Sequence, residues 1–146
     1  MIAFERGREL AQEYRLEARA DLRPVLHDHR IEIIPWRFEG RVREVIVEGC
    51  VAIDDHYGEA WTLCLTAHAL GHHLLHTGAS LYLESWQWVN KVKAERQAEE
   101  FAAGLFAAGY PRRPATAKGL ARRLGIPESK AELILTLEAG HDLRNG

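Results

Sequence analysis

The sequence predicts an α+β fold dominated by helices, and three observations support this class. Apolar residues recur at three- and four-residue intervals between Phe4 and Leu22, as on one face of a helix. Two runs rich in β-branched residues follow, and two long helical stretches come after them. At 146 residues the chain is long enough for a sizeable core. We therefore expect one compact unit, in which residues 1–110 form the main domain and residues 111–146 a small helical part packed on it.

The N-terminal helix is expected to cover a small sheet built from the two β-rich runs. These runs are Arg30 to Phe38 and Val42 to Ile53, with a turn at Glu39-Gly40 between them and a bend or bulge at Gly49. The proline in the first run has no amide hydrogen, which favours an edge position for that strand. Together the runs predict a three-stranded antiparallel sheet.

Two long helices are predicted next, from Glu59 to His76 and from Ser85 to Ala108. Gly78 fits the stop of the first helix, and Gly109 with Pro111 fits the stop of the second. On a helical wheel the second helix has one apolar side that two carboxylates interrupt. That side carries Trp88, Val92, Glu95, Glu99, Ala102 and Phe106.

The last third of the chain predicts two short helices that resemble a helix-turn-helix in outline. Gly125-Ile126-Pro127 supplies the turn, and Ser129 with Glu132 forms a capping-box pattern that opens a helix to about Leu137. Basic residues gather before the turn, which weakly indicates contact with nucleic acid; three glutamates in the second helix argue against a recognition helix. The basic residues are Arg112, Arg113, Lys118, Arg122 and Arg123.

The composition excludes several classes of protein. Lys and Arg total 19 against 21 Asp and Glu, a formal net charge of −2, so no global positive field attracts nucleic acid. The longest nearly apolar run is interrupted by threonines and histidines, and the charged N-terminus does not suit a signal peptide. We expect a soluble, cytoplasmic protein without a membrane partner. Cys50 and Cys64 have neither CxxC spacing nor the density of a disulfide framework, and we expect two buried thiols.

A histidine cluster on the first long helix is the strongest chemical signal. His68 and His72 are four residues apart, so both imidazoles lie on one helix face and can share one metal ion; His72 and His76 have the same spacing. Glu95 and Glu99 interrupt an apolar face, and a buried carboxylate needs a cation, a hydrogen-bond donor or a metal. A metal site and a buried Glu/His or Glu/Arg pair both remain open on this evidence.

Two segments resemble the ImmA/IrrE family of metallopeptidases. Residues Trp61 to His76 read WTLCLTAHALGHHLLH, similar to that family's zinc helix, whose pattern is close to FTLAHELGHxLLH. Residues Glu95 to Leu105 read ERQAEEFAAGL, similar to the second family motif, close to ExxANxFAAxLL. The order of helix, sheet, zinc helix, second helix and helical C-terminal part also agrees. The resemblance implies a zincin-like metallopeptidase fold.

The resemblance also implies roles for individual residues. His68, His72 and Glu95 would bind one zinc ion per chain as a gluzincin-type site, although two histidines and a carboxylate also suit Fe(II). Glu99 stands where the family has Asn or Asp and would orient a ligating histidine through its other ring nitrogen. His73, like His76, would lie on the helix surface or in the outer shell of the site.

Ala69 departs from the family pattern at the position that matters for catalysis. In HExxH the glutamate after the first histidine is the general base, and Ala69 has no ionisable group. Losing a positioned base removes a factor of roughly 10² to 10⁴ in rate. Two explanations remain open: a substitution introduced into an active enzyme, or the native residue of a pseudoenzyme.

Two functions therefore compete. The resemblance implies a zinc endopeptidase that cleaves a helix-turn-helix transcriptional repressor in a stress, mobile-element or defence circuit, here catalytically silent. Its extended substrate would add to the edge strand at Ile33, Ile34 and Trp36. The alternative is a non-catalytic, antitoxin-like module in which zinc stabilises a partner-binding fold.

Overall fold

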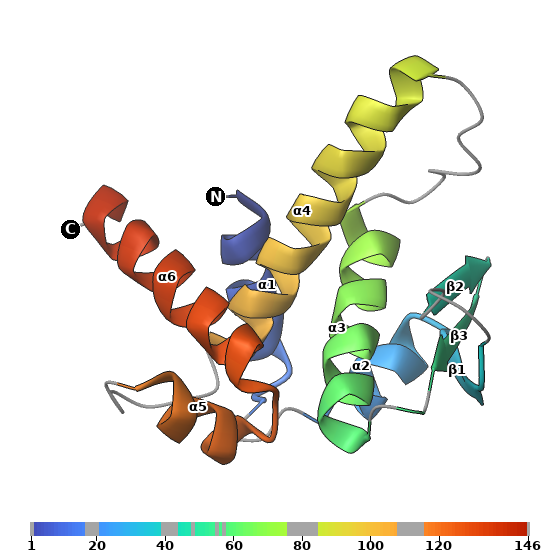
Figure 1. Ribbon diagram of the computed structural model, residues 1–146, viewed down its shortest axis with the longest axis horizontal. Helices are drawn as coiled ribbons and strands as arrows, with labels where there is room; N and C mark the ends of the chain where they lie inside the picture. The colour runs from blue at the N-terminus through green and yellow to red at the C-terminus, as the bar shows by residue number, and fades with distance from the viewer. Residues whose placement is uncertain are drawn as a thin grey trace.

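The computed structural model describes residues 2–16, 21–38, 44–47, 49–54, 56, 58–75, 85–107 and 116–145. Helices dominate this part of the chain and a small sheet accompanies them, which confirms the α+β class (Figure 1). The elements in chain order are α1 (Ile2–Glu13), α2 (Arg23–Asp28), β1 (Glu32–Trp36), β2 (Glu44–Val47), β3 (Cys50–Asp54), α3 (Glu59–Leu75), α4 (Ser85–Ala107), α5 (Ala117–Leu124) and α6 (Glu128–Asn145). No helix in these described ranges is both long and apolar enough to cross a bilayer.

The sheet is mixed, so the prediction of three antiparallel strands is wrong. The strand order is β1-β3-β2, with β2 antiparallel and β1 parallel to β3. The second β-rich run contains two strands because Gly49, with a φ of 75°, turns the chain back on itself instead of bending one strand. Residues 37–43 lie between β1 and β2, and this connection is longer than that of a tight hairpin. Strand β1 can therefore pair with β3, the second strand of the β2–β3 hairpin. The predicted edge position of β1 is confirmed; the predicted turn at Glu39-Gly40 lies outside the described residues.

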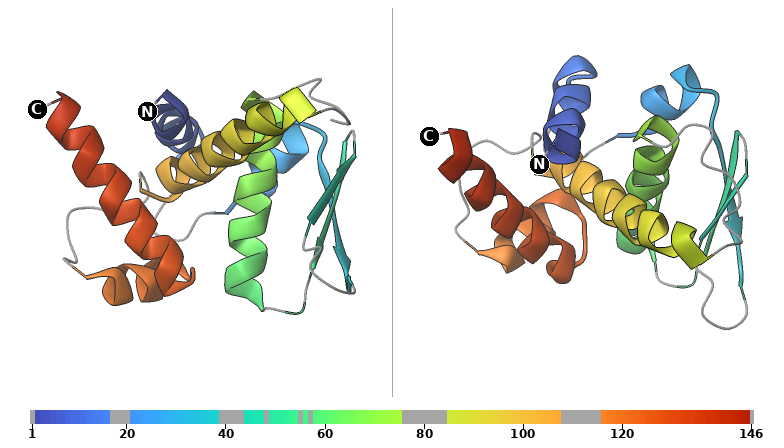
Figure 2. Two further views of the ribbon diagram at one scale, coloured as in Figure 1. Left: turned by 45° about the horizontal axis from the view of Figure 1, so that its top comes forward. Right: turned by 90° about the horizontal axis from the view of Figure 1, so that it is seen from above.

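The N-terminal segment does not form the single helix predicted from Phe4 to Leu22. Helix α1 ends at Glu13, and Arg15 takes a left-handed conformation with a φ of 53°. A separate short helix, α2, then begins with Pro24 in its first turn, where a missing amide hydrogen costs nothing. Helix α1 packs against α4 and not against the sheet (Figure 2).

Two glycines explain how α1 and α4 can pack so closely. A Cβ atom on Gly7 would collide with the carbonyl oxygen of Phe101, and one on Gly104 would collide with the carbonyl oxygen of Phe4. The two backbones are therefore in direct contact at this crossing. Helix α3 lies on the other side of α4 and separates it from the sheet (Figures 1 and 2).

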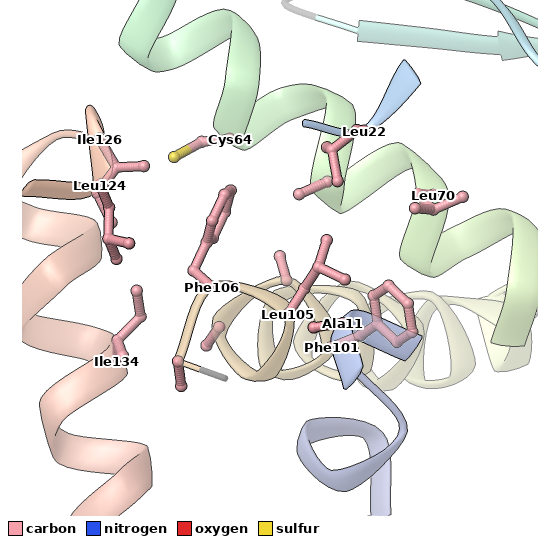
Figure 3. Packing of buried hydrophobic residues seen from close by; sticks show 14 of the residues in the cluster. Ala11, Leu22, Cys64, Leu70, Phe101, Leu105, Phe106, Leu124, Ile126 and Ile134 are labelled. Carbon is pink, nitrogen blue, oxygen red and sulfur yellow. The ribbon is translucent and has the colours of Figure 1, made fainter. Parts of the chain in front are cut away.

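The C-terminal helices share the core of the rest of the chain. Phe106 of α4 lies between Cys64 of α3 and apolar side chains of the α5–α6 region (Figure 3). These side chains are Leu124, Ile126 and Ile134. Helix α6 therefore packs against α4 and shares its apolar core. Cys64 is buried as predicted, whereas Cys50 is only half-buried; both are free thiols.

The α5–α6 connection follows the predicted turn, but the predicted cap is wrong. The amide of Gly119 donates to the Thr116 hydroxyl at the start of α5, and Gly125 closes that helix with a φ of 72°. Helix α6 already begins at Glu128, so Ser129 lies inside its first turn. The helix continues to Asn145, beyond the predicted end near Leu137.

Candidate metal centre

The histidine pair and Glu95 meet because α3 and α4 pack closely at Gly71. A Cβ atom there would lie 3.1 Å from the carbonyl oxygen of Ala98, so a larger residue would require α4 to shift by a few tenths of an ångström. His68 and His72 are one turn apart on α3, and Glu95 is one turn before Ala98 on α4. The small residue on α3 therefore brings the carboxylate of α4 to both imidazoles.

The three side chains converge through their terminal atoms. Glu95 Oε2 lies 2.9 Å from His68 Nε2, and Glu95 Oε1 lies 3.0 Å from His72 Nε2. The two Nε2 atoms are 3.1 Å apart, and the rings meet edge to face at 73°. Bonds of about 2.0–2.1 Å to a tetrahedral zinc ion put neighbouring ligand atoms about 3.3 Å apart. The two short contacts of Glu95 use different carboxylate oxygens; one ligand atom from each of the three residues lies within 4.8 Å of the others, so together they could hold a metal ion.

The electrostatics of the cluster also suit a cation. The hydrogen bonds from His68 and His72 lower the pKa of Glu95 well below its ordinary value, against the opposing effect of burial. Glu95 is therefore ionised at neutral pH, which is the state a metal ligand needs. The histidine side chains are 12% and 15% exposed, and that of Glu95 is 49% exposed. An ion can therefore reach the cluster from the carboxylate side.

Glu99 lies on the side of the His68 ring opposite to Glu95. Its Oε1 atom is 3.2 Å from His68 Nδ1, the ring nitrogen that faces away from Glu95. Lys130 of α6 donates to both Glu99 oxygens at 2.9 Å. The contact with His68, and then the hydrogen bonds and charge of Lys130, lower the pKa of Glu99 to about 2, although burial opposes them. The sequence required a partner for Glu99 but did not identify Lys130, because the two residues lie 31 positions apart on different helices.

The position expected to hold a general base is occupied by a buried alanine. Ala69 is only 1% exposed and belongs to the apolar core. Its neighbours in the sequence, His68 and Leu70, are respectively a candidate ligand and a fully buried core residue. The nearby carboxylates of Glu95 and Glu99 are both engaged by histidines.

Other predicted site residues lie elsewhere. The ring of His73 meets that of His29, at the end of α2, edge to face with 6.0 Å between centroids. Burial and then the charge of His29 lower the pKa of His73. The helix-surface or outer-shell role expected for His73 stays a prediction. His76 lies outside the described residues, so the alternative pair His72 and His76 is not tested.

The predicted substrate strand borders a different cavity. Ile33 of β1 lines an open cleft of about 770 Å³, together with residues of α2 and the first half of α3 that include Leu26 and Thr62. Among the described residues that line this cleft, none is a candidate metal ligand. Ile34 is half-buried and Trp36 is exposed at the end of the strand. The edge-strand role therefore remains a prediction, without a link to the metal centre.

The apolar side predicted for the second long helix is only partly buried. Ala102 and Phe106 lie in the core, but Val92 is 52% exposed. The N-terminal half of α4 extends beyond the described end of α3 (Figure 1). The exposed basic residues of α5 are Lys118, Arg122 and Arg123, and Arg112 and Arg113 lie outside the described residues.

Comparison with family models, with curated proteins and with solved structures found no match for this chain. The case for a metal centre therefore depends on the geometry of His68, His72 and Glu95, and on the motifs that contain them.

Proposed function

We propose that this chain binds one zinc ion through His68, His72 and Glu95, and that it is a metallopeptidase-like protein of the ImmA/IrrE type without a general base. The observation that carries the proposal is the convergence of two imidazole nitrogens and one carboxylate within 3.1 Å of one another. The motifs on α3 and α4 support the same assignment, because they place these three residues where the family has its ligands.

The chemistry available to such a site depends on its own side chains. Zinc, when bound, polarises a carbonyl oxygen and lowers the pKa of water toward neutrality. His68, His72 and Glu95 would hold the ion, and Glu99 would orient the His68 ring. Ala69 has no group that accepts a proton. We therefore expect peptide hydrolysis to be slower by roughly 10² to 10⁴ than with a glutamate there.

The partner is proposed from the resemblance alone. A helix-turn-helix repressor is the expected substrate of an active form and the expected binding partner of a silent one. The alanine at position 69 suits the second case for the chain as it stands, because a protein that binds its target without cleaving it needs no acid there. The alternative function is thus a zinc-stabilised module that sequesters a repressor.

Elemental analysis of the purified chain tests the metal site. We expect about one zinc per wild-type chain and a loss of that zinc in His72→Ala. His27→Ala is the matched control, because His27 is an exposed histidine on α2, outside the cluster. If the wild-type chain takes up no zinc when zinc is supplied, the three residues are a polar cluster and the proposal is rejected.

A further inference from the structure

Lys130 on the C-terminal helix α6 contacts Glu99, and Glu99 in turn contacts His68, one of the candidate metal ligands. Its Nζ atom lies 2.9 Å from each oxygen of Glu99 and 5.8 Å from the ring centroid of Trp61 on α3. The side chain is 27% exposed. Lys130 is thus held between α3 and α4 at a defined place.

The surroundings of this ion pair are largely apolar. Glu99 and Lys130 line a small pocket at the meeting point of α3, α4 and α6. The other residues that line it are Cys64, Ala102, Ala103, Phe106, Leu133 and Ile134. A partly buried pair is less screened by solvent than a surface pair, so it restrains both side chains more strongly.

The carboxylate of Glu99, restrained by Lys130, in turn contacts His68, a candidate metal ligand. This carboxylate lies 3.2 Å from His68 Nδ1, while His68 Nε2 faces Glu95 and His72. A carboxylate that accepts from the outer nitrogen of a ligating histidine fixes both the tautomer and the orientation of the ring. The carboxylate can do so only if it stays in place itself.

We propose that Lys130 is a positioning residue for the metal site, which holds the Glu99 carboxylate against His68 and thereby keeps His68 Nε2 directed at the metal. This inference rests on the proposed zinc site. It gives helix α6 a role in metal affinity although α6 supplies no ligand. Without Lys130, the carboxylate of Glu99, whose side chain is 34% exposed, is free to turn toward solvent.

The positioning effect of Lys130 and its positive charge change the zinc affinity in opposite directions, so an experiment can distinguish them. The positive charge of Lys130 repels a nearby metal cation, so removing the charge alone would tighten zinc binding. Removing the positioning effect would weaken it. The positioning effect also requires Glu99, whereas the repulsion does not.

A double-mutant cycle on the full chain tests the proposal. The zinc dissociation constant is measured by competition with a chelator for wild type, Lys130→Met, Glu99→Gln and the double variant. Lys118→Met, at an exposed lysine of α5, controls for the loss of one charge. We expect zinc binding about tenfold weaker in Lys130→Met, the lower end of the effect of outer-shell changes. In the Glu99→Gln background we expect Lys130→Met to cause no further weakening, because only the relief of charge repulsion remains there, and we expect no weakening in Lys118→Met.

A nuclear magnetic resonance measurement supplies a readout that general destabilisation would not mimic. In the zinc-loaded wild type, the proton on His68 Nδ1 should be protected from exchange with water, and in Lys130→Met its signal should broaden. Unchanged or tighter zinc binding in Lys130→Met would overturn the proposal, as would a loss that persists in the Glu99→Gln background. A wild-type chain that binds no zinc would reject the metal site and this role together, whereas wild-type binding with an unaffected Lys130→Met would reject this role alone.

Discussion

At the scale of single residues, Ala69 determines which reactions the His68, His72 and Glu95 cluster can support. The two imidazoles and the carboxylate would supply ligands to the proposed metal ion, but nothing at position 69 can take up a proton. The side chain at this position is buried among apolar neighbours, where an unpaired carboxylate would be costly. A glutamate there is stable only if it turns toward the metal or finds a donor.

Ala69→Glu should convert the silent chain into a peptidase if the metallopeptidase assignment is correct. We expect a gain of roughly 10² to 10⁴ in the rate of cleavage of a helix-turn-helix repressor, because a general base is restored. The measurement is repressor cleavage followed by gel electrophoresis across a panel of repressors, with Ala69→Gln as the matched control that has the same size and no base. If the zinc-loaded Ala69→Glu chain binds a repressor and leaves it intact, the sequestering module is the better description.

Glu99 should make the zinc-free protein sensitive to acid. Its pKa is lowered from 4.5 to about 2, so its ionised form stabilises the fold above pH 4.5, and this contribution is lost as the pH falls from 4.5 toward 2. In Glu99→Gln the free energy of unfolding should therefore fall less steeply over this range than in wild type. Urea unfolding at a series of pH values measures the slope. Identical slopes for the two proteins would show that Glu99 does not titrate differently in the folded and unfolded states.

At the scale of elements, the position of α4 depends on two close approaches. Gly7 and Gly104 let α1 and α4 touch backbone to backbone, and Gly71 lets α3 approach the turn of α4 that follows Glu95. The distance of Glu95 from the histidines is thus set by small residues outside the cluster. A change at these glycines would displace α4, and Glu95 with it, without altering His68, His72 or Glu95.

Gly104→Ala should destabilise the protein, although alanine is normally the better helix former. A Cβ atom at this position collides with the carbonyl oxygen of Phe4, a backbone atom that cannot move independently. We expect a loss of about 1–3 kcal/mol in the free energy of unfolding, as for other overpacked sites. Thermal or urea unfolding measures it. A gain of about 0.5–1 kcal/mol, as for an unobstructed helix glycine, would contradict the close crossing.

At the scale of the whole molecule, the C-terminal helices belong to the same core as α3 and α4. Phe106 is 2% exposed and lies between α3 and the α5–α6 region (Figure 3). The Lys130–Glu99 pair adds a polar link between the same parts. We therefore expect the chain to unfold as a single unit.

Phe106→Ala tests whether the chain unfolds as a single cooperative unit. Removing a buried aromatic ring leaves a cavity and should lower the free energy of unfolding by about 3–5 kcal/mol. The ring packs against both α3 and the α5–α6 region. Circular dichroism and tryptophan fluorescence should therefore report one common urea transition in wild type and in the variant. Leu143→Ala, at an exposed position near the end of α6, is a control that should change little. Two separate transitions would show that α5 and α6 form an independent unit.

The sequence by itself determined the features that depend on local geometry. The helical class, the positions of α3 and α4, and the common face of His68 and His72 follow from 3.6 residues per turn and from start and stop signals. The edge position of β1 followed from a proline that cannot donate a hydrogen bond. Each of these depends on residues a few positions apart.

Only the tertiary structure decided the features that depend on contacts between distant segments. These are the parallel pairing of β1 with β3, the packing of α1 on α4, the distance from Glu95 to the histidine pair, and the ion pair of Glu99 with Lys130. The Glu95 and Lys130 contacts bridge side chains 23 and 31 positions apart. Such contacts depend on how helices and strands approach one another, and small residues such as Gly71 and Gly104 control that approach without any periodic signal of their own.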